Sequence, residues 1–392
     1  MNIGLWYWTP TDRPAHGSHV HGHYLIRYFR EFGHRVNVCW YHDPNPLCRL
    51  YRRRQIGRFL AESDVHYFRL GNAGGRDLLS LVKLVPLLSR PLVWELNAVP
   101  EGARFSGWST SRVNRGKFWH RVVGPMVDAG IGHTADQAAY LRGAGVRDVS
   151  LVRLGTDTRL LRPELRCEEF RRHYGDRFLV VWAGKTVGRW NDLGTVLWAA
   201  RLLEDRRKDI AFLMVGDGRG LPGRLPSNVH CLGPVPYSQM GRVLASCDCG
   251  LALYRLEHGY DKRQYSPLKL YDYMASGLAV VVQRDGPVAA EVQHGRTGLL
   301  IEGTAGCLAE TLGRLANCRE LAWRLGMAGR RRAEAELDWR LVVRRKLAVI
   351  ERAVARAGGA RSCQHVVAHS GDRPEDTSPG LAQTEAVFAP GR

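Results

Sequence analysis

The stretch "YSPLKLYDYMASGLAVVV", residues 265–282, predicts a short helix followed directly by a buried strand. Ser266 is a favourable N-cap residue, and Pro267 suits the first helical position, where its missing N–H group breaks no hydrogen bond. Gly277 fits the left-handed position that ends many helices, and the apolar residues 278–282 have the length of a strand. Such a succession of helix and strand is typical of parallel α/β folds.

Lys269 lies in the first turn of this predicted helix, where the backbone dipole favours a negative charge. A phosphate bound at the helix N-terminus would resolve the conflict, because both the free N–H groups and the lysine attract an anion. A lysine that simply points into solvent is the alternative, and the local sequence favours neither interpretation.

The composition indicates a globular protein with room for two domains. The chain has 392 residues, of which 45% are hydrophobic and 24% are charged. Its nine cysteines form no C-x-x-C pair, and their odd number argues against a disulfide framework. The N-terminal residues lack a basic segment, and Lys83, Pro86 and Arg90 interrupt the longest apolar region, so we expect neither a signal peptide nor a membrane span. These features predict a cytoplasmic protein.

The formal net charge of +19 favours an anionic partner. A membrane surface, a phosphorylated substrate and a nucleic acid all meet that requirement. The cluster "CRLYRRRQIGRF", residues 48–59, would suit a helix that faces a membrane, and a solvated helix face is the alternative. No reader motif and no alternation of basic and aromatic residues accompanies the charge, so we expect no nucleic acid partner.

Strand and helix patterns alternate along the chain and predict an α/β protein with two Rossmann-like domains that face a cleft. We expect an N-terminal domain at residues 1–160 and a C-terminal domain at 161–340. Residues 341–357 predict a helix that packs back on the N-terminal domain, and residues 358–392 predict a disordered tail, because the tail is polar and has no periodicity. In such folds ligands bind at the carboxyl ends of the strands.

Several common motifs are absent. The segment "GDGRGLPG", residues 216–223, fails the dinucleotide-binding pattern because Leu221 occupies the third glycine position. The segment "GKTVGR" does not have Walker A spacing, and the chain contains neither Asp-x-Asp nor Gly-x-Ser-x-Gly. Four histidines at residues 16–23 lack a carboxylate or cysteine at ligand spacing, so we expect no metal site.

Seven ordered stretches carry a resemblance to a known family. They are "HGSHVHGHYLIRYFREFGHRV", "LVRLGTDTRLLRPE", "LVVWAGKTVGRWNDLGTVLWAARLL", "FLMVGDG", "VHCLGPVP", "SPLKLYDYMASGLAVVV" and "EVQHGRTGLLIE". In their order and spacing the chain resembles the retaining glycosyltransferases of the GT-B fold, and within them glycosyltransferase family 4, from Asn2 to about Ala355. The resemblance implies an acceptor-side N-terminal domain and a donor-binding C-terminal domain. It also implies sugar transfer from a nucleotide diphosphate sugar to a hydroxyl acceptor, with retained configuration and without a metal or other cofactor.

The resemblance also assigns roles to the opening stretch. It places the donor diphosphate at the helix N-terminus formed by Ser266, Pro267, Leu268 and Lys269. Asp272, one turn into the helix, stands where a family carboxylate accepts hydrogen bonds from the ribose hydroxyls. Gln264 stands where the family usually has a first glutamate, and its amide can bind sugar hydroxyls but carries no charge.

Leaving-group chemistry needs cations where the diphosphate gathers charge. Lys185 matches the first member of a basic pair in the family, and Asn191 stands where the second lysine is usual. Arg189 is the expected substitute for that second lysine. A solvated loop cation is the alternative for Lys185 or Arg189 taken alone.

Four further residues complete the expected site. Gly17 would allow the backbone to approach the donor phosphates closely, and His21 occupies a position that is often histidine in the family. Asn97 follows the strand "PLVWELN" at a position where many members have a histidine that contacts the donor sugar, and Val235 is expected to contact the donor. The nearby Glu95 fits two roles equally well: a part of this site, or a structural hydrogen-bond acceptor at the end of the strand.

The departures from the family pattern leave two interpretations open. The first is an active transferase in polysaccharide or glycoconjugate biosynthesis, and the net charge suggests a lipid-linked acceptor at the inner face of the membrane. The second is a catalytically weakened partner subunit that binds nucleotide without turnover, because Gln264 and Asn191 replace charged residues.

Overall fold

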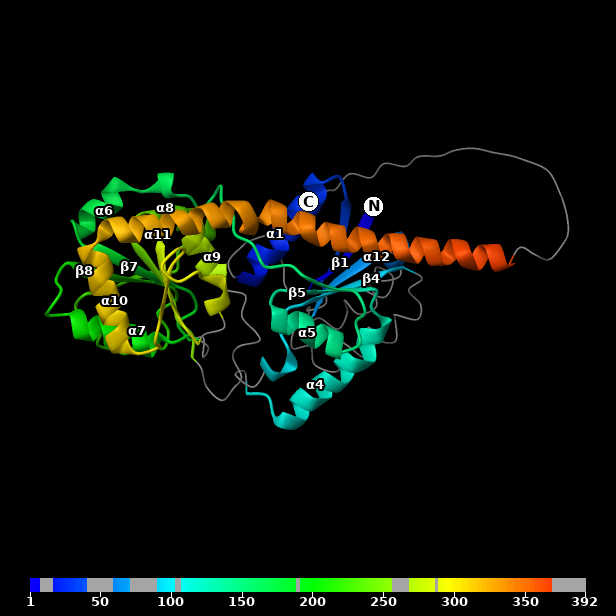
Figure 1. The fold of residues 1–392 in the computed structure, drawn as a ribbon, viewed down its shortest axis with the longest axis horizontal. Helices are drawn as coiled ribbons and strands as arrows, with labels where there is room; N and C mark the ends of the chain where they lie inside the picture. Colours follow the sequence, from blue (N-terminus) through cyan, green and yellow to red (C-terminus); the bar gives the residue numbers. More distant parts are fainter. Residues whose placement is uncertain are drawn as a thin grey trace, which may run out of the picture. The chain divides into compact units, whose positions relative to one another are not determined.

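The computed structural model describes residues 1–7, 17–40, 59–70, 90–102, 107–187, 191–255, 268–285 and 288–368 (Figure 1). Both of its β-sheets belong to the compact unit Met1–Val354. The basic cluster at 48–59, except for its last residue, and the predicted site residues Arg189, Gln264, Ser266 and Pro267 lie outside the described residues.

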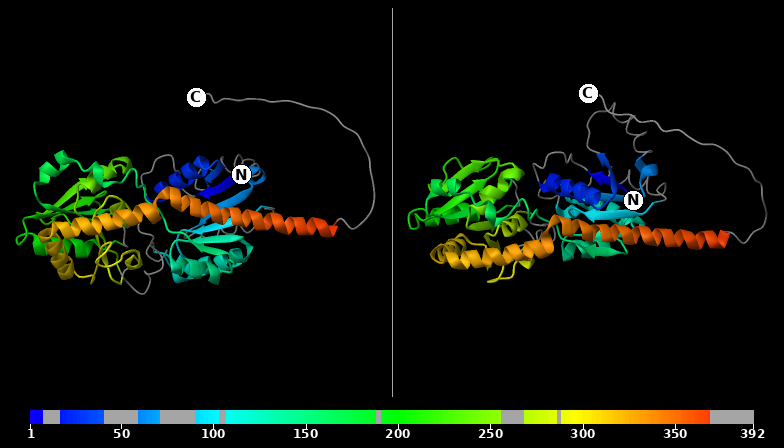
Figure 2. Two further views of the ribbon diagram at one scale, coloured as in Figure 1. Left: turned by 45° about the horizontal axis from the view of Figure 1, so that its top comes forward. Right: turned by 90° about the horizontal axis from the view of Figure 1, so that it is seen from above.

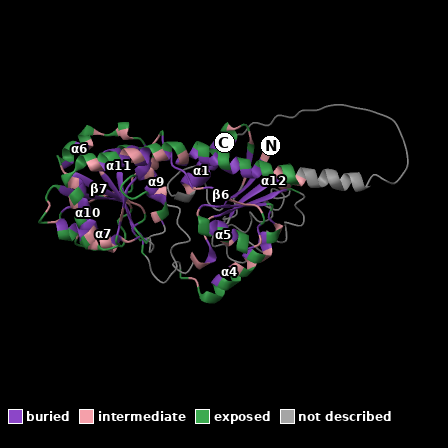
Figure 3. Ribbon diagram, viewed as in Figure 1, coloured by how far each residue is buried: buried purple, intermediate pink, exposed green. Residues whose placement is uncertain are grey.

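Each sheet has six parallel strands, as the α/β prediction requires. The first sheet has the order β2-β1-β3-β4-β5-β6, and its strands are β1 Asn2–Tyr7, β2 Arg35–Trp40, β3 Val65–Leu70, β4 Leu92–Leu96, β5 Ala129–Gly132 and β6 Val149–Leu151. The second has the order β12-β11-β10-β7-β8-β9, and its strands are β7 Phe178–Ala183, β8 Ile210–Val215, β9 Val229–Gly233, β10 Cys249–Ala252, β11 Ala279–Gln283 and β12 Leu299–Ile301. The central strands are buried on both faces (Figure 3), which explains their continuous apolar sequences. The prediction of two Rossmann-like sheets is confirmed.

Helices cover both faces of the first sheet. Helix α1 (Gly17–Glu31) and the first part of α12 (Trp339–Ala368) share a core with Leu5, Tyr67 and Ile131, which point to one face. Helices α4 (Thr110–Val123) and α5 (Ala135–Gly143) cover the other face, where Phe68 and Trp94 are buried. The alternation of side chains along each strand produces these two cores.

The second sheet is also covered on both faces (Figure 2). Helices α7 (Leu193–Leu203) and α10 (Ala305–Asn317) pack over Val180, Trp182 and Phe212. Helices α8 (Tyr237–Ala245) and α9 (Leu268–Ala275) contribute to the core on the opposite face. The other elements are α6 Glu168–Tyr174, α11 Arg319–Arg332, the π-helical segment Ala333–Leu337 and the 3-10 turns Gly124–Met126, Pro163–Leu165 and Ala289–Glu291.

The end of α9 has the predicted geometry. Gly277 has a φ of +75°, and the Leu278 N–H donates to the Tyr273 carbonyl at 3.1 Å. These are the features of a glycine-terminated helix, and β11 begins two residues later. The predicted helix, its terminating glycine and the following strand are therefore confirmed, whereas the predicted N-cap lies outside the described residues.

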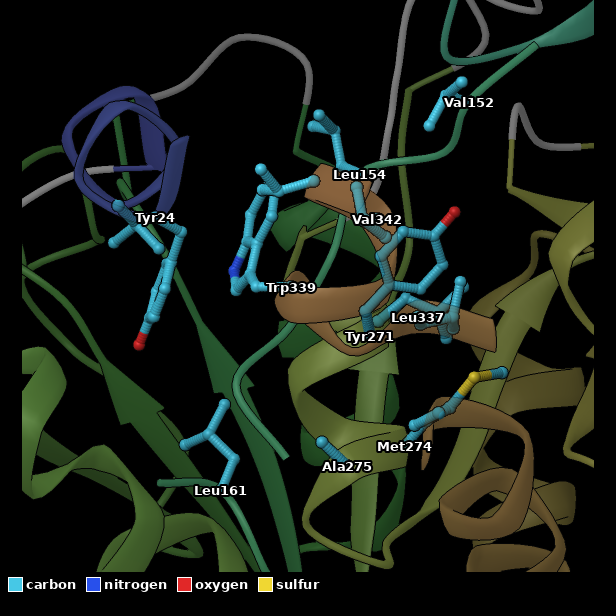
Figure 4. Close-up of a cluster of buried hydrophobic side chains, with 14 of the residues drawn as sticks. Tyr24, Val152, Leu154, Leu161, Tyr271, Met274, Ala275, Leu337, Trp339 and Val342 are labelled. Carbon is cyan, nitrogen blue, oxygen red and sulfur yellow. The ribbon is translucent and has the colours of Figure 1, made fainter. Parts of the chain in front are cut away.

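Two segments that connect the sheets are hydrogen-bonded to each other. The Thr156 N–H donates to the Leu337 carbonyl at 2.8 Å, and the Trp339 N–H donates to the Thr156 carbonyl at 3.0 Å. Trp339 is fully buried and stacks on Tyr24 of α1, with 5.5 Å between ring centroids (Figure 4). Gly155 makes room for the indole, because a Cβ at this position would lie 2.7 Å from the Trp339 ring.

The C-terminal helix is longer than predicted. We expected disorder from residue 358, but α12 continues to Ala368. Gly358 and Gly359 lie within this helix. Each glycine costs a helix only about 1 kcal/mol relative to alanine, so a long helix can pass through both. The boundaries at residues 160 and 340 stay predictions.

We expect Gly326→Ala to destabilise the protein. Gly326 lies in α11, and a Cβ there would lie 2.0 Å from the Gly277 carbonyl oxygen, so α11 would have to move away from the end of α9. Overpacking of this kind costs about 1–3 kcal/mol, measurable by urea denaturation. Gly306→Ala in α10 is the matched control, because a Cβ there meets open space. Equal stabilities of the two variants would contradict the prediction.

Candidate functional site

The predicted site residues that the structure describes follow the carboxyl ends of strands or begin helices. Lys185 follows β7 and is exposed, and Asn97 follows β4 and is half-buried. Gly17 is the first residue of α1, and Leu268 is the first residue of α9. Val235, in the segment after β9, is partly buried against the core. The carboxyl edge of a parallel sheet is the usual place for a ligand.

Lys269 has an unusual environment. Its Nζ atom lies 4.2 Å from the centroid of the Trp182 ring and 3.1 Å from Oδ1 of Asn191. A second ring, that of Tyr254, lies 5.7 Å away. Burial lowers the pKa of Lys269 to about 7. Among the described residues no carboxylate pairs with this ammonium group, so a bound anion would compensate a charge that the protein leaves unpaired.

Gly184 and Asn191 position the Lys269 side chain. A Cβ at Gly184 would lie 3.1 Å from Nζ, so a larger residue would crowd the ammonium group. The Asn191 side chain is buried; its Nδ2 donates to the Lys185 carbonyl at 2.9 Å while its Oδ1 accepts from Lys269. The asparagine therefore ties the loop after β7 to the N-terminus of α9. This structural link is an alternative to the direct donor contact predicted for Asn191.

Asp272 accepts two hydrogen bonds from hydroxyl groups. The Thr156 Oγ1 donates to its Oδ1 at 2.7 Å, and the Tyr237 hydroxyl donates to the same oxygen at 3.2 Å. Burial and, to a smaller extent, the nearby Asp157 carboxylate raise the pKa of Asp272 to about 7, against the lowering effect of the two hydrogen bonds. The carboxylate lies about one turn after Lys269 in α9, in agreement with the predicted helical spacing.

Asp157 is the second carboxylate near Asp272. Its Oδ2 accepts from the Tyr24 hydroxyl at 2.5 Å, and its Oδ1 accepts from the backbone N–H groups of Arg159 and Leu160. Tyr24, Thr156, Asp157 and Tyr237 were not predicted as site residues. The sequence offered only a weak signal for them, the "LGTD" loop at 154–157 and the position of Tyr237 directly after "GPVP".

A fully buried network surrounds Glu95 at the end of β4. Its Oε1 lies 3.1 Å from Arg69 Nε and 3.0 Å from both His21 Nε2 and His133 Nε2. Its Oε2 accepts from Lys346 Nζ at 2.9 Å and from the Tyr67 hydroxyl. These partners come from β3, α1, the residue after β5, and α12, so one carboxylate connects four parts of the fold.

The negative charge of Glu95 is compensated by its neighbours. Burial alone would raise the pKa of Glu95, but the surrounding positive charge lowers it well below its ordinary range. Burial lowers the pKa of His21 well below 6.5 and that of Lys346 to about 8. His21 thus lies inside a hydrogen-bonded core, where it also contacts the Trp339 ring. Its donor contact stays a prediction, and the Glu95 carboxylate has the structural role that the sequence left open.

A cavity of about 580 Å³ adjoins the loop after β7. Asn191, Thr186 and Trp198 line it together with three arginines, Arg201, Arg224 and Arg255. Of these arginines, Arg201 is paired with the Glu204 carboxylate at 2.6 Å. The described residues contain no cluster of three or more His, Cys, Asp or Glu side chains that could hold a metal ion.

We expect Asp272→Asn to stabilise the ligand-free protein at pH 8 and to stabilise it less at pH 5. The pKa of Asp272 is about 7 in the folded chain against an ordinary value of 3.8. The folded state therefore holds the proton more tightly, and stability is lost as the pH rises from about 4 to 7, since ionised Asp272 disfavours folding. Asparagine stays neutral and avoids this loss.

Urea denaturation of both proteins at pH 5 and pH 8 checks this expectation. Asp285→Asn, which removes an exposed carboxylate, is the control and should have the same effect at both pH values. If Asp272→Asn were less stable than the natural chain at pH 8, the negative charge of Asp272 would not disfavour folding.

Comparisons with known proteins agree with this architecture. Residues 177–318 match the model of the family described as glycosyl transferases group 1. No curated protein matches the sequence. Among solved structures the chain is similar to sucrose-phosphate synthase from Thermosynechococcus elongatus, with a TM-score of 0.70 and 16% identity over 91% of this chain and 99% of that one.

Two further structures are similar over nearly the whole chain. Anabaena HepE in complex with UDP and glucose has a TM-score of 0.65 and 14% identity, over 90% of this chain and 100% of that one. A glycosyltransferase from Rickettsia africae ESF-5 has a TM-score of 0.67 and 12% identity, over 90% of this chain and 98% of that one. Identities this low establish the shared fold alone, and the family match covers residues 177–318. The chain thus has the GT-B fold and contains a segment, residues 177–318, that matches the group 1 glycosyltransferases, and together these findings support a glycosyltransferase.

Proposed function

We propose that the protein transfers a sugar from a nucleoside diphosphate sugar to a hydroxyl acceptor, with retention of the anomeric configuration and without a metal. The observation that carries the proposal is Lys269, a desolvated cation in the first turn of α9 for which the described residues supply no carboxylate. Asp272 lies one turn further on, and the family match of residues 177–318 covers both residues. A diphosphate would supply the missing negative charge at a helix N-terminus.

The proposed sugar transfer uses positive charge at the place where the departing diphosphate becomes more negative. The bond between the anomeric carbon and the phosphate oxygen breaks, and the departing diphosphate gains negative charge beside Lys269 and the N–H groups of α9. Lys185, which is exposed after β7, is proposed to bind the same group. The acceptor oxygen then bonds to the anomeric carbon from the same face, and its proton passes to a phosphate oxygen. Asn97 and Gln264 are proposed to contact the sugar.

Uridine diphosphate is the donor base to test first. One similar structure is Anabaena HepE in complex with UDP-glucose, with a TM-score of 0.65, and this supports the choice. A partner subunit that binds nucleotide without turnover is the second candidate, since Asn191 replaces a lysine and is already occupied by two protein hydrogen bonds.

We further propose assignment to family 4 and a role in polysaccharide or glycoconjugate biosynthesis. The acceptor would be lipid-linked and the protein cytoplasmic, at the inner membrane face, which the net charge of +19 supports. Within the described residues every helix is too short or too polar to cross a bilayer.

Lys269→Met is expected to weaken UDP binding at least tenfold while raising the melting temperature of the ligand-free protein. The pKa of Lys269 is about 7 when folded against 10.5 ordinarily, so its charge disfavours folding, in full below pH 7, and methionine removes that cost. Calorimetry and thermal unfolding at pH 6.5 measure both effects. Lys208→Met, which removes an exposed lysine, is the control. If the variant bound UDP as tightly as the natural chain, the proposed diphosphate site would be wrong.

Hydrolysis or transfer with a panel of nucleotide sugars distinguishes the two candidates. Release of UDP from one donor sugar at a steady rate supports the enzyme. Tight binding of UDP with no release from any donor, in the presence of polyprenyl phosphate acceptors, supports the partner subunit.

The membrane proposal has its own test. We expect the protein to co-sediment with vesicles that contain anionic lipids and to be released as the salt concentration rises, because exposed arginines and lysines drive such binding. Neutral phosphatidylcholine vesicles are the control. Equal binding to both kinds of vesicle, or to neither, would contradict a charge-driven membrane contact.

A further inference from the structure

We propose that Thr156 and Tyr237 are positioning residues that hold one oxygen of Asp272, so that its other oxygen accepts the ribose hydroxyls of the donor. The inference rests on the proposed function and adds to it the two side chains that prepare the ribose site. Neither residue belongs to the loop after β7 or to the N-terminus of α9, where the diphosphate would bind.

The geometry of the two hydrogen bonds carries the inference. Both the Thr156 hydroxyl and the Tyr237 hydroxyl donate to Oδ1 of Asp272, at 2.7 and 3.2 Å. A carboxylate oxygen has two lone pairs, so these donors saturate Oδ1. No hydrogen bond to Oδ2 comes from the described part of the chain, and Asp272 is only partly buried. The free oxygen can only accept, which selects a ligand that donates hydrogen bonds, such as a vicinal diol.

Asp157 provides a contrast within the same cluster. Its two oxygens are occupied by the Tyr24 hydroxyl and by the N–H groups of Arg159 and Leu160. Of the two neighbouring carboxylates, Asp272 is therefore the one that retains an oxygen for a ligand. The negative charge of Asp157 also raises the pKa of Asp272, and the two hydroxyl donors oppose this rise.

The two donors are themselves held in place. The backbone of Thr156 is hydrogen-bonded to Leu337 and Trp339, which fixes the direction of its side chain. Tyr237 is the first residue of α8 and packs against the core. The orientation of Asp272 thus depends on three separate elements, the segment after β6, α8 and α9. A loop residue alone would leave the carboxylate free to rotate.

The test compares UDP with 2′,3′-dideoxy-UDP by calorimetry at pH 8. The natural protein should bind UDP at least tenfold more tightly, because only UDP donates to Asp272. Tyr237→Phe and Thr156→Val remove one donor each without changing side-chain shape greatly, and each should reduce this ratio at least threefold. In the double variant, the ratio of the affinity for UDP to that for dideoxy-UDP should approach the ratio of Asp272→Asn. All variants should bind dideoxy-UDP with unchanged affinity.

Matched controls separate positioning from a loss of structure. Thr158→Val removes the hydrogen bond from Thr158 Oγ1 to Asp338, at 2.5 Å in the same segment, and Tyr140→Phe removes a hydroxyl near His120. Both should leave the ratio unchanged even where they lower the melting temperature.

Three results would overturn the inference. If the natural protein binds UDP without preferring it to the dideoxy form, Asp272 does not bind the ribose. If Tyr237→Phe and Thr156→Val weaken both nucleotides equally, the two hydroxyls act only on the fold, and the proposed function still stands. If the natural protein binds neither nucleotide nor any nucleotide sugar, the proposed function fails together with the inference.

Discussion

The hydrogen bonds between Thr156 and the segment Leu337–Trp339 are the constraint on which the rest of the site depends. The chain passes between its two sheets at these segments, and the two hydrogen bonds hold the passages together. This pairing places the Trp339 indole against Tyr24 of α1 and starts α12. It also directs the Thr156 hydroxyl to Asp272. A change in the pairing would therefore alter a hydrophobic contact of the first sheet and a carboxylate of the second at once.

The buried charge of Glu95 is paired with opposite charges, whereas the buried groups Lys269 and Asp272 have no such partner among the described residues. Glu95 is surrounded by Arg69, Lys346, two histidines and Tyr67, so its charge is compensated and the network connects α1, β3, the residue after β5 and α12. Lys269 and Asp272 lack such compensation, and burial moves both pKa values to about 7. Uncompensated groups cost folding free energy, and proteins retain them where a ligand supplies the missing partner. The contrast separates a structural network from a candidate binding site.

Some features could be predicted because they depend on local sequence. Alternating strand and helix patterns indicated two parallel sheets, and Gly277 indicated the end of α9. The carboxylate one turn after Lys269 follows from helical spacing alone. Other features could not be predicted, because they join residues far apart in the chain. Lys346 approaches Glu95 from a helix near the C-terminus, and Tyr237 approaches Asp272 from α8. The sequence also does not show that His21 lies in a buried network, and its donor contact stays a prediction.

The sequence by itself determined the α/β class, the order of the elements, the family resemblance and the position of Lys269 and Asp272 on one helix. The class, the order of the elements and the helix positions follow from periodicity and spacing, which act over a few residues, while the resemblance rests on the order of seven stretches along the chain. Only the tertiary structure decided which of the charged groups are paired. The sequence does not show that Asn191 holds Lys269, that two hydroxyls share Oδ1 of Asp272, or that Glu95 is enclosed by cations. The reason is physical: the pKa and the availability of a side chain depend on burial and on neighbours brought together by folding.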